Sequence, residues 1–273
     1  MSTLRTMYMS DLPTVLKIIA ATDEEDAEAA EAEFHDDGLD NQYVLEVEGK
    51  VVGISGFRLV PGTDATYWLN WTYLAPEYHG KGLGRILLEQ TLRHLRELEA
   101  RMVFVKVSDY VDDEEQRVYE SAHAVYEKMG FEPALIGHDF YDDGENQHIM
   151  RLSYSQVEAS EGEGYVVADE KPVIRFNGLH EIAETDGAYT FRWTVEESTK
   201  LFGKRSFSEQ DLKIGLESVK NDGGRKVFLT FPSNLPLIHK PLQAVGFKYV
   251  GQLTDYYERG VHELHFVHHL NGV

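Results

Sequence analysis

Hydrophobic residues in the first part of the chain recur with two different periods. Alternating or β-branched runs predict strands, over residues 4–9, 42–47, 51–60, 65–74, 102–107, 131–136 and 148–152. Elsewhere apolar residues repeat every three or four positions and predict helices, one beginning at residue 10 and two over 82–100 and 117–129. The predicted order is a strand, a helix, and then a run of strands interrupted by two further helices.

Residues 23–40 form a helix-compatible segment that is unusually acidic. The segment holds ten carboxylates among eighteen residues, together with four alanines and Phe34. A solvated helix face accounts for such a charge run in most proteins. The alternative is an acidic lid over a site for a cationic substrate, and the sequence leaves both interpretations open.

The second part of the chain repeats the first. With a shift of 122 residues, 43–74 match 165–196 at ten of thirty-two positions, including Trp71 with Trp193. With a shift of 116, Gly130 and Phe131 match Gly246 and Phe247. This pattern predicts a duplicated domain. We expect domains at 1–154 and 165–273, joined by a small, polar and acidic linker at 155–164.

The composition narrows the classes of partner and chemistry. There are 47 acidic and 26 basic residues, a formal net charge of −21, which disfavours nucleic acid and anionic membrane surfaces and favours cationic partners such as amines. The chain has no cysteine, which excludes disulfides, thiolate nucleophiles and cysteine-ligated metals. We see neither a signal peptide nor an apolar run of about 20 residues, so we expect a cytoplasmic protein.

The segment with the strongest chemical signal is 73–85, YLAPEYHGKGLGR, in which a predicted strand runs through a glycine-rich loop into a predicted helix. Glycines let backbone N–H groups approach a ligand closely, and the first turn of a helix offers unpaired N–H groups at the positive end of its dipole. Together these features predict a diphosphate cradle. A dinucleotide fold is disfavoured because the preceding strands look antiparallel, and a Walker loop is excluded because Gly-Lys-Ser/Thr is missing.

Two motifs make residues 4–153 resemble the GNAT superfamily of acyl-CoA-dependent N-acyltransferases. The first is HGKGLG at 79–84, and the second is AHAVYEKMGF at 122–131. The resemblance implies an α/β (α+β) fold with a mostly antiparallel mixed sheet flanked by helices, followed by a second, truncated GNAT-like domain. It also implies an N-acetyltransferase that moves an acetyl group from acetyl-CoA to a primary amine, on a small molecule or a peptide, by direct attack and without a metal.

The resemblance also assigns roles to individual residues. The pantetheine of acetyl-CoA would lie along a strand in a V-shaped opening, bonded to the backbone of Thr72, Tyr73 and Leu74. The diphosphate would bind the N–H groups of Gly80, Lys81, Gly82, Leu83, Gly84 and Arg85. Tyr126 would protonate the departing thiolate, and the N–H near Leu74 would stabilise the oxyanion. The plainer interpretation of Tyr126 is an aromatic side chain packed on a helix face.

The chain departs from the family pattern at several positions. His79 replaces the usual glutamine or arginine at the start of the loop, and Tyr119 replaces an asparagine that contacts CoA in many members. Family members often carry a glutamate or histidine as general base where this chain has Trp68 and Asn70. The remaining candidates for the base are Asp109, Glu33 and His35, or a chain of waters.

The second copy has lost the features that carry the chemistry. Its counterpart of the loop, 201–207, lacks the paired glycines, and Leu242 stands at the position of Tyr126. We therefore expect a degenerate domain that covers apolar surface, shapes the acceptor site or mediates a homodimer. A non-catalytic acyl-CoA-binding or sensor protein is the alternative function for the whole chain.

Four histidines lie near the C-terminus. They are His262, His265, His268 and His269. On a strand, residues four apart are about 13 Å apart, too far for one metal ion. The spacing therefore predicts no metal site there.

Overall fold

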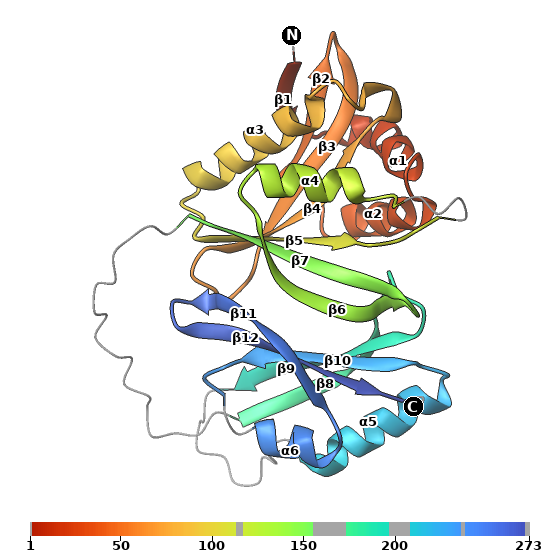
Figure 1. The fold of residues 1–273 in the computed structure, drawn as a ribbon, viewed down its shortest axis with the longest axis vertical. Helices are drawn as coiled ribbons and strands as arrows, with labels where there is room; N and C mark the ends of the chain where they lie inside the picture. Colours follow the sequence, from red (N-terminus) through yellow and green to blue (C-terminus); the bar gives the residue numbers. More distant parts are fainter. Residues whose placement is uncertain (1, 113–116, 155–172, 197–207, 236–237, 271–273) are drawn as a thin grey trace. The chain divides into compact units, whose positions relative to one another are not determined.

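The computed structural model describes residues 2–112, 117–154, 173–196, 208–235 and 238–270 (Figure 1). The predicted linker at 155–164 and the loop at 201–207 lie outside these ranges. The chain divides into two compact units, one of residues 1–139 with 143–155 and the other of residues 140–142 with 156–273. No helix within the described ranges is long and apolar enough to cross a membrane.

The first unit contains a seven-stranded sheet in the order β1-β2-β3-β4-β5-β7-β6. Its strands are β1 Ser2–Thr6, β2 Gln42–Val47, β3 Lys50–Leu59, β4 Thr66–Leu74, β5 Met102–Ser108, β6 Glu132–Asp142 and β7 Glu145–Ser153. β1–β2, β2–β3, β3–β4 and β5–β7 pair antiparallel, whereas β4 and β5 pair parallel. The predicted mixed sheet of mostly antiparallel strands is confirmed.

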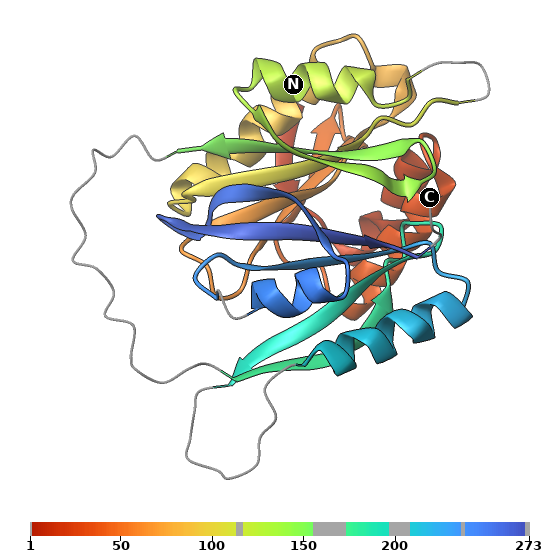
Figure 2. The same ribbon diagram turned by 60° about the horizontal axis from the view of Figure 1, so that its bottom comes forward.

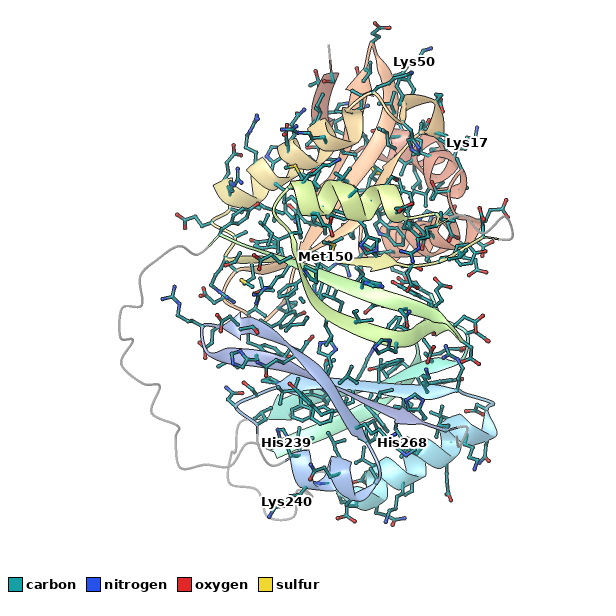
Figure 3. The ribbon with its side chains drawn as sticks, in the orientation of Figure 1. Lys17, Lys50, Met150, His239, Lys240 and His268 are labelled. Carbon is teal, nitrogen blue, oxygen red and sulfur yellow. The ribbon has the colours of Figure 1, made fainter. Side chains whose placement is uncertain are left out.

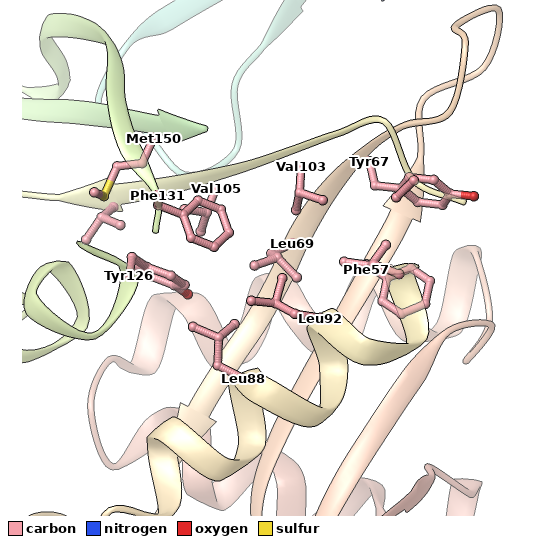
Figure 4. Close-up of a cluster of buried hydrophobic side chains, with 13 residues drawn as sticks. Phe57, Tyr67, Leu69, Leu88, Leu92, Val103, Val105, Tyr126, Phe131 and Met150 are labelled. Carbon is pink, nitrogen blue, oxygen red and sulfur yellow. The ribbon is translucent and has the colours of Figure 1, made fainter. Parts of the chain in front are cut away.

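Four α-helices cover the two faces of this sheet. They are α1 Leu12–Ala20, α2 Glu24–Asp36, α3 Leu83–Glu97 and α4 Glu120–Lys128, with short 3-10 turns η1 Met9–Asp11 and η2 Pro76–Tyr78. The buried side chains of α1 and α2 share a cluster with Val44 and Ile54. Those of α3 and α4 share another with Val105 and Met150, on the opposite face (Figures 1 and 4).

The second unit contains a five-stranded sheet and two helices. Its elements are β8 Val173–Glu181, β9 Ala188–Glu196, α5 Glu209–Asn221, β10 Lys226–Pro232, α6 His239–Ala244, β11 Lys248–Glu258 and β12 Val261–His269. Helices α5 and α6 lie side by side on one face of the sheet, where Leu212, Leu216 and Leu242 join a buried cluster of their own (Figure 2). The unit therefore has a separate hydrophobic core.

The sheets of the two units share their connectivity. The order β8-β9-β10-β12-β11 in the second repeats β3-β4-β5-β7-β6 in the first, and β9 and β10 again pair parallel. The turns also correspond. Asp139 and Asp255 both have left-handed backbones, with φ of 46° and 55°, and accept the N–H of Gly144 and Gly260 at 3.0 and 2.9 Å.

Several elements differ from their predicted limits. The predicted strand at 4–9 is β1 followed by η1, because Asp11 bonds Arg5 and the N–H of Tyr8 and turns the chain at that point. The helix predicted at 117–129 begins at Glu120. β6 and β7 are longer than predicted and form a hairpin whose polar residues 137–147 conceal the strand pattern.

The ion pair at the start of α1 generates a prediction about stability and pH. Arg5 donates from Nη1 and Nη2 to Asp11 at 2.7 and 2.9 Å, and these hydrogen bonds lower the pKa of Asp11. The stabilisation by ionised Asp11 is therefore fully present above the carboxyl pKa of the unfolded chain, about 3.9. It is lost as pH falls through the lower pKa that Asp11 has in the folded chain. Asp11→Asn should cost about 1–3 kcal/mol at pH 7 in urea unfolding.

The same substitution should cost much less at pH 3, where the wild-type carboxylate begins to take up its proton. The exposed carboxylate of Asp36 provides a matched control. Asp36→Asn should leave the difference between the free energies of unfolding at pH 7 and pH 3 unchanged. An equal cost of Asp11→Asn at both pH values would contradict the assignment.

Candidate functional site

Strand β4 carries a β-bulge at Trp71. Asn70 pairs with Gly56 and Tyr73 with Ile54, so that two residues of β4 oppose the single Ser55 of β3. Trp71 adopts a left-handed backbone with φ of 48°, which is rare for a bulky side chain. The bulge reverses the alternation of side chains along the strand.

This reversal sorts the residues of β4 between the two faces of the sheet. Leu69, before the bulge, belongs to the cluster of α3 and α4. Trp71 would share the face of Leu69 on a regular strand, because the two residues are two positions apart. Instead Trp71, together with Tyr73, packs against the cluster of α1 and α2 on the other face. Thr72 is thereby directed to the side of α4.

The bulge also accompanies a separation of β4 from β5. The two strands pair over Thr66–Trp68 and Met102–Phe104, and both continue beyond these residues, to Leu74 and Ser108. Strands that diverge leave backbone N–H and C=O groups on their facing edges for another partner. The predicted pantetheine residues Thr72, Tyr73 and Leu74 lie on this diverging part of β4.

Tyr126 on α4 reaches the same part of β4. Its hydroxyl bonds Thr72, whose own hydroxyl lies 3.0 Å from that of Ser55. Its ring packs against Phe131 in an edge contact, with 5.4 Å between ring centroids, and is buried in the α3–α4 cluster (Figure 4). Burial raises the pKa of Tyr126 to about 12, against the opposing effect of Thr72, so the phenol keeps its proton at neutral pH.

The predicted diphosphate cradle is open. Gly80 and Gly82 have left-handed backbones, with φ of 70° and 75°, and a Cβ added at Gly80, Gly82 or Gly84 would meet no atom within 4 Å. The N–H of Ile86 bonds the carbonyl of Gly82 at 3.2 Å, so the N–H groups of 83–85 belong to the first turn of α3 and have no preceding carbonyl in the helix. This geometry fits a bound diphosphate.

Side chains of the loop tie it to its own backbone. His79 donates from Nε2 to the carbonyl of Leu74 at 2.8 Å, and Lys81 donates from Nζ to the carbonyl of Glu77 at 2.6 Å. Arg85 bonds Glu89 at 2.7 Å on the exposed side of α3. The histidine that departs from the family pattern therefore joins the loop to the end of β4, and two cations stay beside the cradle.

Two phenols connect β4 and α4 to the acidic start of α2. Tyr73 donates its hydroxyl to Asp26, and the hydroxyl of Tyr119 lies 3.1 Å from Asp23 and 3.3 Å from Asp26. Burial, followed by the charge of Asp26, raises the pKa of both phenols. Part of the acidic segment therefore has internal partners, and the contact of Tyr119 with CoA stays a prediction.

The three candidates for the general base differ in their surroundings. Glu33 is bonded by Arg58 at 2.8 Å and by Asn70 at 3.0 Å, whereas His35 is exposed on α2. Burial alone would raise the pKa of Asp109, but hydrogen bonds from Asn146 and from His148 outweigh it and lower that pKa. A carboxylate of low pKa is a weak proton acceptor.

Sequence reasoning missed His148, which bonds Asp109. His148 lies on β7, far from Asp109 in the sequence, and its Nε2 is 3.3 Å from Oδ2 of Asp109. The antiparallel pairing of β5 with β7 brings the two together. No short motif joins them, so only a correct alignment of those two strands could have revealed the pair.

Among its described residues, the second unit repeats the divergence but not the bulge of β4, since β9 and β10 pair only over 188–190 and 226–228. Its bulge lies on β8, at Gly178, because Phe176 pairs with Trp193 and Leu179 with Phe191. Trp193 donates from Nε1 to the carbonyl of Thr230 at 2.7 Å, which links β9 to β10. Leu242, at the position of Tyr126, is fully buried in the core of the second unit.

The C-terminal histidines lie on β12 and bind neighbouring groups. Nδ1 of His262 accepts the N–H of Asp255 at 2.9 Å, and Nε2 of His265 lies 3.0 Å from Glu263. The ring of His268 packs against that of Phe247, with 5.3 Å between centroids. Figure 3 labels His268 in the second unit. Among the described residues, no three histidines or carboxylates are grouped so as to hold a metal ion.

Comparison with known proteins gives a family match within the first unit. Residues 3–131 match the acetyltransferase (GNAT) family. A Bacillus subtilis (strain 168) protein named as a [ribosomal protein bS18]-alanine N-acetyltransferase is 28% identical in an alignment of 130 residues that covers 45% of this chain and 78% of the relative.

Solved structures resemble part of this chain. A Desulfovibrio desulfuricans protein described as a GNAT-family acetyltransferase aligns with a TM-score of 0.50 at 23% identity, over 57% of this chain and 100% of its own. A Salmonella typhimurium acetyltransferase solved with acetyl-CoA aligns at 0.46 and 19% identity, over 59% of this chain and 99% of its own. The resemblance seen in HGKGLG and around Tyr126 is confirmed, and residues 3–131 are a domain of the acetyltransferase (GNAT) family.

Proposed function

We propose that this chain transfers an acetyl group from acetyl-CoA to a primary amine, and that the amine belongs to a peptide or protein. The family of residues 3–131 supports the acetyl transfer. The name of the Bacillus relative, which specifies an alanine of a ribosomal protein, favours a peptide amine over a small molecule. The net charge of −21 suits an acceptor that arrives as a cation.

The observation that carries the proposal is the position of the Tyr126 hydroxyl. It lies against Thr72 on the diverging part of β4, and the same strand leads directly into the open glycine loop. A proton donor and a diphosphate cradle thus flank one stretch of backbone. We infer that this stretch holds the thioester, with the backbone of Thr72–Leu74 bonded to the pantetheine.

Bound acetyl-CoA supplies a thioester that an amine can attack directly. The N–H groups of 80–85 would hold its diphosphate, and the N–H near Leu74 would stabilise the negative charge on the carbonyl oxygen. Tyr126 would give its proton to the sulfur as the carbon–sulfur bond breaks. The bond from His79 to the carbonyl of Leu74 holds the loop against β4 for this purpose.

Replacement of Tyr126 tests the proton donor. Tyr126→Phe removes the hydroxyl and keeps the packed ring, so turnover should fall by about 10²–10⁴ while affinity for acetyl-CoA stays near wild type. Thiol release in the presence of a peptide with an N-terminal alanine measures turnover, and calorimetry measures the affinity for acetyl-CoA. Tyr154→Phe also removes a half-buried hydroxyl of the first unit and serves as the control. An unchanged rate would exclude Tyr126 from the mechanism.

Replacement of Gly82 tests the cradle. Gly82→Val places a side chain in the open space above the loop, and acetyl-CoA binding should be lost in calorimetry. Gly62→Val is the matched control, since Gly62 also has a left-handed backbone with nothing within 4 Å and therefore imposes a similar strain in a turn away from the loop. Tight binding by the Gly82 variant would place the diphosphate elsewhere.

We propose that the transfer site of the first unit is the single site of the chain. Leu242 has no proton to give. Although β9 and β10 diverge as β4 and β5 do, the side chain of Trp193 bonds the carbonyl of Thr230 and so links the two strands. Titration of the full chain with acetyl-CoA should therefore give one equivalent bound. Two equivalents would assign a working site to the second unit.

A non-catalytic acyl-CoA-binding protein is the second candidate. Trp68 and Asn70 stand where many family members carry the general base, which favours binding without turnover. Such a protein would bind acetyl-CoA in calorimetry and release no thiol with any peptide or polyamine. Thiol release that depends on the amine distinguishes the enzyme.

A further inference from the structure

A polar cluster lies where β5 ends beside β7. Asp109 accepts the backbone N–H of Asn146 at 2.7 Å and its side-chain Nδ2 at 2.7 Å, and it bonds Nε2 of His148 at 3.3 Å. His123 of α4 contacts His148 with perpendicular rings, 5.1 Å between centroids. Strands β5 and β7 and helix α4 therefore together position the imidazole of His148.

The carboxylate determines which nitrogen of His148 carries the hydrogen. Hydrogen bonds hold the pKa of Asp109 below its usual range in spite of burial, so the group is an acceptor at neutral pH. Nε2 of His148 must then be the donor, which leaves the lone pair on Nδ1, on the other side of the ring. The side chain of His148 is 31% exposed, so water reaches it.

Helix α4 brings this imidazole and the proton donor to the same region. Tyr119, His123 and Tyr126 are spaced by four and three residues and share one face of the helix. Tyr126 meets Thr72 on the β4 side of the divergence, and His123 bonds the backbone of Ser108 on the β5 side. The imidazole pair and the phenol therefore border the diverging strands from opposite sides.

The second unit shows which part of the cluster the fold requires. There the N–H of His262 bonds Oγ of Ser233 at 3.0 Å, as the N–H of Asn146 bonds Asp109. Leu264 occupies the position of His148. A side-chain oxygen at the end of β10 is thus enough to bond the neighbouring strand β12. The pair of Asp109 and His148 is found in the unit that also contains Tyr126.

From this geometry we propose that His148, oriented by Asp109, is the general base that deprotonates the acceptor amine. The inference rests on the proposed acetyl transfer. The acceptor ammonium gives one proton to Nδ1 of His148, which passes it to water. The electron pair left on nitrogen forms the new carbon–nitrogen bond as the carbon–sulfur bond breaks. Tyr126 gives its proton to the departing thiolate, and the second proton lost from nitrogen restores the phenol.

Other charged groups surround this imidazole. Asp109 faces it from the end of β5, and His123, with Glu127 nearby, faces it from α4. On β7, Glu145 bonds Ser108, and His138 of β6 bonds Asn146. Burial, and next His148, lower the pKa of His123, so that ring is neutral near pH 7 and does not repel an ammonium group.

The test is the pH dependence of transfer to an alanine-first peptide by the full-length chain. His148→Gln keeps a donor for Asp109 and should lower kcat/KM by about 10²–10⁴ at pH 7 without changing acetyl-CoA affinity. The loss should shrink at high pH, where the peptide amine is already neutral. Imidazole in the buffer should restore part of the activity of His148→Ala. His94→Gln, on the outer part of α3, is the control and should behave as wild type.

Each other outcome overturns the inference. A rate within about threefold of wild type for His148→Gln, with the same pH profile, would exclude His148 as the base. A variant that also loses acetyl-CoA affinity, with no rescue by imidazole, would assign His148 a purely structural role. A wild-type chain that binds acetyl-CoA but acetylates no amine would refute the proposed function itself, which is visible before any variant is made.

Discussion

The left-handed backbone of one tryptophan in a central strand is the constraint on which the proposed transfer site depends. A bulky residue with φ of 48° is unfavourable by itself, and packing must compensate for it. Trp71 is held on the α2 side, where its ring meets Phe34 in an edge contact with 6.3 Å between centroids. The bulge turns Thr72 to the opposite face, where the hydroxyl of Tyr126 meets it.

The two units show what the same strand order can and cannot supply. Both have a parallel pair at the centre of the sheet, at β4–β5 and at β9–β10. In the second unit the extra residue lies on the neighbouring strand, and Trp193 bonds across the central pair. In both units the central strands continue beyond their paired residues, so neither strand order nor divergence by itself makes the proposed transfer site. What the first unit adds is the bulge on β4, which turns the hydroxyl of Thr72 toward α4.

Basic and acidic side chains lie in different parts of this domain. The chain is acidic overall, yet Lys81 and Arg85 stand beside the glycine loop, where an anion would bind. Asp23 and Asp26, from the most acidic segment, bond the phenols of Tyr73 and Tyr119. Its inner carboxylates therefore have partners within the domain, and many of the others are solvated, whereas the lid over a cationic substrate stays a prediction.

The sequence by itself determined the class of fold, the glycine loop and the place of Tyr126 on its helix, because helix period, glycine spacing and a strand-to-helix junction are local properties of the chain. It predicted the order of the elements but missed the full length of β6 and β7, since polar hairpin residues conceal the alternation. Only the tertiary structure decided the bulge at Trp71 and the pairing of Asp109 with His148. Both depend on the register between strands distant in sequence, and register is set by the packing of whole sheet faces rather than by any short motif.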